Sequence, residues 1–376
     1  MIALEKFIRE HDNWEEILTK EPYFLKVSRD GEYIMFKYDQ IKGSDFNIPL
    51  VKNARGIIFR EADWTCVCHP FDKFGNYGEE YCPDINWKKC SVQQKIDGSL
   101  IKVWYDNGKW HISTNGLIDA FKAPVDHNPM KIETFGDLFC YELKFCGAID
   151  SFEKLGKSLD EDYTYMFELI TEYNRVVVPA ENYESSIYLL GARNIKTNEE
   201  VDLDGSYLSQ VFYMPKRYNL HTLDEVVKAA AELPWDEEGY VVCDNKFNRV
   251  KIKSPEYVKA HYGRTNGNVS LLRIIALILN NETAEFLVYA SDYADIVANV
   301  EKAMQEFKEK MAKTVIELTP ESFATRKELA EKVKTYPKHY QAFLFRYDNL
   351  DSAFERLRPS QWKDIFDIEG VLKNEN

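Results

Sequence analysis

Short apolar stretches alternate with turn signals over the first 254 residues of the chain. The stretches are rich in β-branched and aromatic side chains, which is typical of strands. We expect strands over Tyr33–Tyr38, Gly56–Phe59, Leu100–Tyr105, Trp110–Thr114, Tyr163–Leu169, Ile187–Leu190, Gly239–Cys243 and Val250–Lys253. Asn107-Gly108 predicts a tight hairpin turn, because both residues tolerate positive φ angles. With a helix expected over Thr222–Leu233, this pattern indicates an antiparallel α+β domain.

The spacing of apolar residues changes after Pro255 to three- and four-residue steps. This spacing predicts helices over Val269–Leu279 and Asp292–Leu318, a helix start at Thr319-Pro320-Glu321 and a last helix around Ser360–Trp362. We therefore expect two domains, an antiparallel-sheet domain over residues 1–254 and an all-helical C-terminal domain over residues 255–376.

The charge of the chain is uneven. Its 48 Lys and Arg residues face 62 Asp and Glu residues, a net charge of −14. This balance argues against a protein that binds nucleic acid by bulk positive charge. A local basic strip nevertheless runs from Asp244 to Arg264, and the helical part is close to neutral, so a basic groove remains possible.

The cysteines and the lengths of the apolar runs indicate the cellular compartment in which the protein is expected. The seven cysteines include no Cys-x-x-Cys pair, so neither a zinc ribbon nor a disulfide framework is indicated, and we expect a protein of the reducing cytoplasm. Cys66, Cys68 and His69 could bind a metal, but strand alternation would put His69 on the other face, and a structural role is the better interpretation. No apolar run approaches the roughly 18 residues of a membrane span, so no membrane association is expected.

Charged residues in or beside apolar segments are the candidate functional residues. Lys95-Ile96-Asp97-Gly98 precedes a strand, and alone it is a weak signal. Glu168 and Glu238 adjoin apolar runs in which a lone carboxylate is costly to bury. Lys251 and Lys253 share one face of a strand, which suggests an anion between them, although a solvated face is also open.

The order Lys-x-Asp-Gly, Phe-Glu, Glu-Gly and Lys-x-Lys resembles the covalent nucleotidyltransferase superfamily of ATP-dependent ligases and RNA capping enzymes. Finer details are similar to the RNA ligase 1 type of T-even bacteriophages. They lie in Ala54–Phe59, Pro70–Asn76, Asn174–Val177 and Gly191–Arg193. The resemblance covers about residues 20 to 255, and it implies an adenylyltransferase fold for the first domain.

The resemblance implies a role for each basic residue of the site. Lys95 would attack the α-phosphate of ATP and form a lysine–AMP phosphoramidate, for which its amine must be neutral. Lys251 and Lys253 would hold the α-phosphate and its developing charge. Arg55 and Lys73 would help hold ATP or the 5′-phosphate of RNA.

The resemblance also implies roles for acidic and neutral residues. Glu238 would hold Mg²⁺, or alternatively Mn²⁺, directly or through water, and Glu168 would bind the ribose hydroxyls or share that metal. Gly98 and Tyr38 would lie at the nucleotide, although Tyr38 could equally be a core aromatic residue.

Two positions depart from the family pattern. Asn115 stands where phage relatives have a basic residue, which puts one phosphate contact in doubt. Gly75 stands where they have a second phenylalanine, and Tyr77 is a candidate replacement for that ring.

The implied reaction is ATP-dependent joining of 5′-phosphate and 3′-hydroxyl RNA ends, by a monomer acting on single-stranded RNA or broken tRNA-like loops. The helical domain would choose the RNA, or else would only cover apolar surface. A capping-type guanylyltransferase and a catalytically inactive RNA-end-binding module are the alternatives. The lack of a β-rich C-terminal domain disfavours the first alternative, and the intact lysine and carboxylates disfavour the second.

Overall fold

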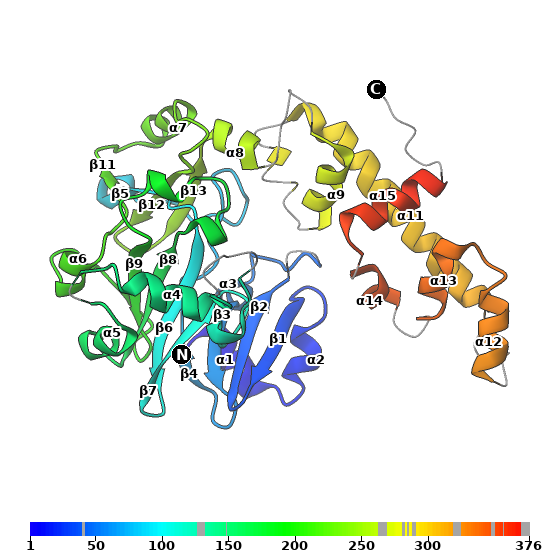
Figure 1. Cartoon of the computed structure of the whole chain (residues 1–376), viewed down its shortest axis with the longest axis horizontal. Coiled ribbons are helices and arrows are strands. Elements are labelled where there is room, and N and C mark those ends of the chain that lie inside the picture. Colours follow the sequence, from blue (N-terminus) through cyan, green and yellow to red (C-terminus); the bar gives the residue numbers. More distant parts are fainter. Residues whose placement is uncertain are drawn as a thin grey trace. The chain divides into compact units, whose positions relative to one another are not determined.

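Three antiparallel sheets form the frame of residues Met1–His261 in the computed structural model (Figure 1). The structure describes residues 1–39, 42–125, 132–147, 149–261, 269–279, 283, 286–287, 291–318, 325–346, 350–355 and 357–369. The chain divides into two compact units, Met1–His261 and Tyr262–Asn376, which are described separately.

The first sheet has the strand order β1-β2-β3-β4, with β1 at Leu25–Asp30, β2 at Tyr33–Tyr38, β3 at Arg55–Arg60 and β4 at Thr65–Cys68. The second has the order β10-β9-β8-β6-β7, with β6 at Ser99–Asp106, β7 at Lys109–Thr114, β8 at Tyr163–Leu169, β9 at Ile187–Asn194 and β10 at Glu200–Val201. The third has the order β11-β5-β12-β13, with β5 at Cys90–Gln94, β11 at Arg217–Tyr218, β12 at Gly239–Asp244 and β13 at Arg249–Lys253.

Every strand expected from the sequence is present, so the α+β class with antiparallel sheets is confirmed. The hairpin between β6 and β7 turns at Asn107 and Gly108, whose φ angles are 49° and 78°. The strands that were not expected, such as β5 and β11, carry few apolar residues or are very short.

Helices lie between the strands. Their bounds are α1 Ala3–Glu10, α2 Trp14–Leu18, α3 Pro49–Asn53, α4 Phe135–Leu143, α5 Phe152–Ser158, α6 Tyr207–Val211, α7 Leu223–Ala231 and α8 Pro255–His261. The helix expected from Thr222 is α7, and the hydroxyl of Thr222 caps it by accepting a hydrogen bond from the amide of Glu225.

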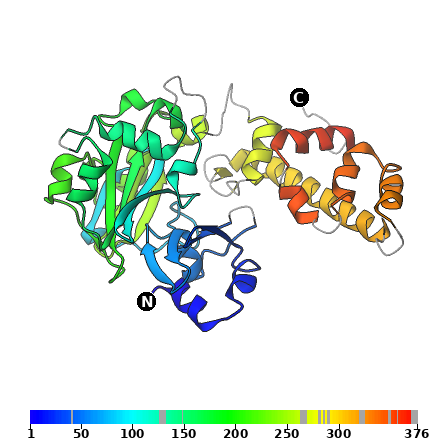
Figure 2. The same cartoon turned by 60° about the horizontal axis from the view of Figure 1, so that its bottom comes forward.

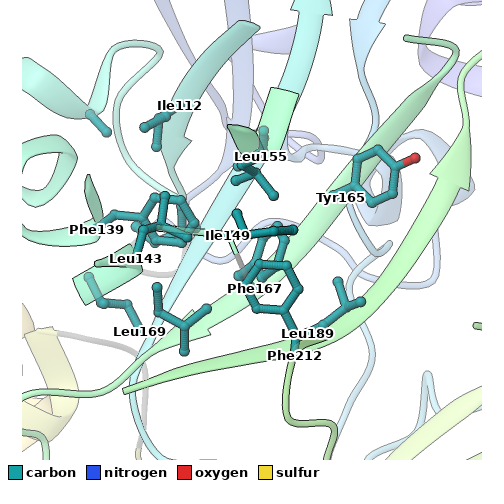
Figure 3. Packing of buried hydrophobic residues seen from close by; sticks show 14 of the residues in the cluster. Ile112, Phe139, Leu143, Ile149, Leu155, Tyr165, Phe167, Leu169, Leu189 and Phe212 are labelled. Atoms are coloured by element: carbon teal, nitrogen blue, oxygen red, sulfur yellow. The ribbon is translucent and has the colours of Figure 1, made fainter. Parts of the chain in front are cut away.

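A buried hydrophobic cluster covers one face of the second sheet, and alternate side chains of β8 point into it. Phe167 of β8 packs against Phe139 of α4 and Phe212, with ring centroids 5.6 Å and 5.2 Å away (Figure 3). Tyr165 and Leu169 belong to the same buried cluster. Because neighbouring residues of a strand point to opposite faces, Glu168 faces away from this core.

The boundary of the first unit lies at His261 rather than at the expected residue 254. Helix α8 belongs to the first unit because the side chain of Tyr257 is buried there, with 2% exposure, and its hydroxyl donates a hydrogen bond to Asp97. The change to helical spacing at Pro255 therefore marks the start of a helix and not the end of the domain.

The regular secondary structure among the described residues of the second unit is helical (Figure 2). They are α9 Leu271–Leu279, the 3₁₀ turn Ser291–Tyr293, α11 Ala294–Leu318, α12 Arg326–Val333, α13 Lys338–Leu344, α14 Leu350–Glu355 and α15 Pro359–Glu369. Phe307 of α11 lies at the centre of an aromatic cluster with Tyr340, Phe343 and Trp362. The helix start expected at Thr319-Pro320-Glu321 lies outside the described residues.

Among the helices that the structure describes, none combines the length and the apolar character needed to cross a membrane.

Candidate active site

Lys95 lies in the loop between β5 and β6, where the third sheet passes into the second. Its backbone amide donates to the carbonyl oxygen of Gly239 at 2.8 Å, which ties the loop to the start of β12. Its side chain is 20% exposed, and Nζ lies 2.7 Å from Oε2 of Glu238. The side chain is therefore partly open to solvent, and its amine is held by a buried carboxylate.

Asp97 anchors this loop from within. Its Oδ2 accepts hydrogen bonds from the amides of Val177 and Val178 at 2.9 and 2.8 Å, and its Oδ1 accepts one from the hydroxyl of Tyr257 at 2.9 Å. Asp97 is 5% exposed, and these three donors compensate for the burial of its charge. The Lys-x-Asp-Gly motif thus owes its shape partly to α8.

Gly98 lets the loop approach β8. A Cβ atom at this position would lie 2.5 Å from the carbonyl oxygen of Leu169 and 3.0 Å from Cγ of Glu168. No side chain fits there without displacing backbone, so the structure gives Gly98 a packing reason. Its contact with a nucleotide stays a prediction.

Glu168 and Glu238 are close enough to influence each other. Burial raises the pKa of Glu168 to about 8, the positive charge of Lys95 opposes this rise, and the negative charge of Glu238 adds to it. Glu238 itself is 4% exposed, and its Oε1 lies 3.4 Å from Nζ of Lys253. The two carboxylates and two of the expected lysines therefore form one cluster.

Lys251 and Lys253 extend from β13 on the same face. The backbone of Lys251 pairs with the segment that follows β4, because its amide donates to Gly75 at 2.9 Å and its carbonyl oxygen accepts from Tyr77 at 2.8 Å. This pairing places the ring of Phe74 beside Lys251, with Nζ 5.5 Å from the ring centroid.

Arg55 also contacts the ring of Phe74. Its Cζ is 5.0 Å from the ring centroid, and Nη1 is buried with no hydrogen-bond partner among the described residues. The positive charge of Arg55 also acts on Glu168. The structure therefore places Arg55 with the cluster around Lys95, and its role at a phosphate stays a prediction.

Lys73 occupies a different environment, an aromatic cage. Its Nζ lies 5.3 Å from the ring of Tyr38, 4.8 Å from that of Phe46 and 5.9 Å from that of Tyr81. Tyr38 is 7% exposed and packs in the core around β2, as its alternative interpretation stated. Contacts of Lys73 and Tyr38 with a nucleotide stay predictions.

Arg193 belongs to a separate network. It pairs with Asp72 at 3.1 Å and with Glu200 at 2.7 Å, and it donates to Nε2 of the buried His69 at 2.7 Å. Burial lowers the pKa of His69, which suits a neutral ring that accepts this bond. An open cavity of about 810 Å³ adjoins this network and reaches Lys73 and Phe74, but its lining includes neither Lys95 nor the two carboxylates.

The carboxylates near Lys95 suit a metal ion that takes most of its ligands from water and substrate rather than from the protein. Within the described part of the chain, no three His, Cys, Asp or Glu side chains are grouped closely enough to hold an ion. Two carboxylates, Glu168 and Glu238, remain. Mg²⁺ is often bound by one or two carboxylates together with water and the phosphates of a substrate, so this pair fits such an ion.

The two departures from the family pattern have different surroundings. A Cβ atom at Gly75 would lie 2.5 to 2.8 Å from the side chains of Glu79, Cys82 and Tyr81, so the site of the missing ring is filled by the protein itself. Tyr77 is 48% exposed. Asn115 lies beside Gly56, and its buried Oδ1 has no hydrogen-bond partner among the described residues.

Sequence reasoning missed two residues of the site. Tyr257 was assigned to the helical domain, and nothing in its spacing indicates a bond to Asp97. Phe74 was noted only as part of a segment, although an aromatic residue directly after Lys73 and near two basic positions could have drawn attention to it.

A protein-family model described as RNA ligase matches residues 53–257, more than half of the chain. The chain belongs to this RNA ligase family, of the T4 RNA ligase 1 type. The match contains Arg55, Lys95, both carboxylates and Lys253, so the resemblance to this family inferred from the motifs is confirmed.

Individual relatives of this chain agree with the family. An RNA ligase of Rhodothermus phage RM378 is 26% identical, and the alignment covers 93% of this chain and 91% of that protein. A protein of Autographa californica nuclear polyhedrosis virus, described as a bifunctional polynucleotide kinase/RNA ligase, is 27% identical. That alignment covers 93% of this chain, which spans 50% of the viral protein.

Among solved structures, an archaeal ATP-dependent RNA ligase aligns with a TM-score of 0.45 and 13% identity. The alignment covers 78% of this chain and 79% of the archaeal chain.

Proposed function

We propose that this protein is an RNA ligase that uses ATP to join a 5′-phosphate and a 3′-hydroxyl RNA end through a lysine–AMP intermediate and adenylylated RNA. The observation that carries the proposal is the position of Lys95. Its side chain is partly exposed, and its Nζ lies 2.7 Å from the buried Glu238, whose other carboxylate oxygen lies 3.4 Å from Nζ of Lys253. A nucleophilic amine, a carboxylate pair and further cations in one cluster suit phosphoryl transfer to lysine.

In the first step, the neutral amine of Lys95 attacks the α-phosphorus of ATP. A bond from Nζ to phosphorus forms, the bond from that phosphorus to the bridging oxygen breaks, and pyrophosphate leaves with the electron pair. Lys251, Lys253 and Arg55 offset the negative charge that develops on the phosphate oxygens. The ion pair with Glu238 keeps the amine oriented, and the proton it holds must leave before attack.

The later steps use the same cations. The 5′-phosphate of RNA displaces Lys95 from AMP, and the 3′-hydroxyl then attacks the adenylylated end and expels AMP. Glu168 and Glu238 would hold Mg²⁺ or Mn²⁺. The bound ion would withdraw charge from the phosphates.

Trapping the covalent adduct tests this function. The protein is incubated in turn with each α-labelled nucleoside triphosphate and then denatured, and we expect label to be retained from ATP alone. Lys95→Ala should abolish the adduct yet still seal RNA that was adenylylated chemically, whereas Lys88→Ala, at an exposed lysine of the same region, should behave as the unmodified protein. Retention of GTP label would indicate a capping enzyme, and an adduct in Lys95→Ala would refute the assignment of the nucleophile.

We further propose that the helical unit selects the RNA. Lys302, Lys308, Lys310 and Lys313 lie on α11, but Lys310 already pairs with Glu369 at 2.6 Å, so not all of them are available to RNA. A chain that ends after His261 keeps Tyr257 and should still form the adduct while losing preference for a broken hairpin loop over a linear strand. An unchanged ratio of the two sealing rates would assign the helical unit a purely structural role.

A further inference from the structure

Lys102 is a fully buried lysine with almost no compensation for its charge. It lies on β6 and has 0% exposure. Its Nζ donates one hydrogen bond, to the carbonyl oxygen of Gly56 at 2.5 Å, and it forms no ion pair within the described residues. An ammonium group has three donors, and burying it without a carboxylate costs free energy of folding. Lys102 therefore lowers the free energy of unfolding of the protein.

The lysine supports the backbone next to Arg55. Gly56 has a φ angle of 81°, and a Cβ atom there would lie 2.8 Å from Nζ of Lys102. The start of strand β3 therefore packs against the ammonium group of Lys102. A movement of this group would move the peptide that follows Arg55.

Two more cations meet at the same place. Lys37 of β2 is the cross-strand partner of Arg55 in β3, and like charges directly opposite each other are unfavourable in a sheet. Within the part of the chain that the structure describes, neither side chain forms an ion pair. Among the described residues, Nη1 of Arg55 is also buried without a hydrogen-bond partner. Three neighbouring cations that form no ion pair within this described part suit an anionic ligand.

The groups that face Lys102 come from three neighbouring strands. Burial lowers the pKa of Lys102 to about 8, the thiol of Cys68 opposes this shift, and the positive charges of Lys37 and Arg55 add to it. A bound anion would favour the charged form of all three cations.

We propose that Lys37, Arg55 and Lys102 form one site for a phosphate group of a reactant, in which Lys37 and Arg55 contact the phosphate and Lys102 is a positioning residue that acts through the Gly56 carbonyl. This inference rests on the proposed ligase function. The phosphate is that of ATP or the 5′-phosphate of RNA, which present the same chemistry to the site.

The test compares Lys37→Met and Lys102→Met with Lys109→Met, a change at an exposed lysine of β7. Adduct formation is measured against ATP concentration, and transfer of AMP from Lys95 is measured against the concentration of 5′-phosphorylated RNA. We expect both test variants to raise the KM of one of these two substrates by about tenfold, and the substrate affected identifies the phosphate. Lys109→Met should leave both values unchanged.

A second readout separates positioning from simple support of the fold. If Lys102 must be charged, the affected KM should rise with pH around 8 in the unmodified protein, and this rise should be absent in Lys102→Met. Should Lys102→Met fail to fold, Lys37→Met and the pH dependence of the unmodified protein decide the question.

Folded variants whose KM for both substrates stays within about twofold would overturn the inference, as would a KM that is flat across pH 8. Failure of the ligase proposal itself is distinguishable, because the unmodified protein would then form no adduct at all.

Discussion

The hydrogen bond from Tyr257 to Asp97 makes α8 part of the active site, and Tyr257→Phe removes it alone. The ring remains, so its packing and its contact with Lys253, whose Nζ lies 5.8 Å from the ring centroid, are kept. Asp97 loses one of three donors and keeps the amides of Val177 and Val178.

The expected loss follows from the type of bond. A hydrogen bond to a charged group contributes about 1.5 to 3 kcal/mol. For a unit the size of Met1–His261, each kcal/mol corresponds to a fall of about 2 to 4 °C in the unfolding midpoint, so we expect a fall of about 3 to 12 °C. Because Asp97 holds the loop of Lys95, the rate of adduct formation should fall by about tenfold.

Thermal unfolding and adduct trapping measure the two effects. Tyr240→Phe is the matched control, because Tyr240 is 4% exposed and its hydroxyl has no hydrogen-bond partner among the described residues. A Tyr257→Phe protein that unfolds at the same temperature as this control, and reacts at the same rate, would show that α8 does not anchor the loop.

Three further predictions concern charge. Burial raises the pKa of Glu168 to about 8 from 4.5, so the folded protein binds the extra proton between these values and loses stability as pH rises through them. Glu168→Gln should abolish this loss, which denaturation across that pH range would reveal, and an unchanged profile would contradict the shift. Lys251→Ala and Lys253→Ala should each cost about 2.7 kcal/mol of transition-state stabilisation, about a hundredfold in the rate of adduct formation, and rates within a few-fold of the unmodified protein would remove them from the mechanism. In the helical unit, burial raises the pKa of Glu369, but hydrogen bonds from Lys310, His339 and Tyr340 lower it to about 2. The stability that these bonds provide should therefore be complete above about pH 4.5 and disappear as pH falls towards 2, and Glu369→Gln should be less stable only above that window.

Strands with continuous apolar runs were predictable, and strands without them were not. Tyr163–Leu169 was found at its full length because it supplies the core with alternate side chains. Strand β5 escaped notice because Val92 is its one buried apolar residue. It is a strand mainly because β12 and β11 pair with it, and pairing over such sequence distances leaves no local signal.

Residues of the site that belong to a sequence motif could be predicted. Residues that only the folded arrangement of strands brings together could not. The residues that the motif order selected lie together in the structure, and the roles expected of them stay predictions. They are Lys95, Glu168, Glu238 and Lys253. The three cations at Gly56 required the register between β2 and β3, which no spacing reveals. A lysine inside the apolar strand Leu100–Tyr105 was a visible signal, and its burial could have been suspected from the sequence.

The pairing of Lys251 with Gly75 and Tyr77 has a consequence for the order in which the protein matures on the ribosome. The segment that contains Phe74 and the segment that contains Lys251 are far apart in the chain, and the second is synthesised late. Glu238, which pairs with Lys95, and Tyr257, which anchors its loop, are synthesised late as well. A nascent chain that has emerged only as far as Lys95 lacks every group that orients this amine. The amine of Lys95 is thus synthesised early, but the groups that orient it are in place only after nearly the whole first unit has left the ribosome. A nucleotide that needs all of these groups for binding could therefore not assist the folding of the early strands.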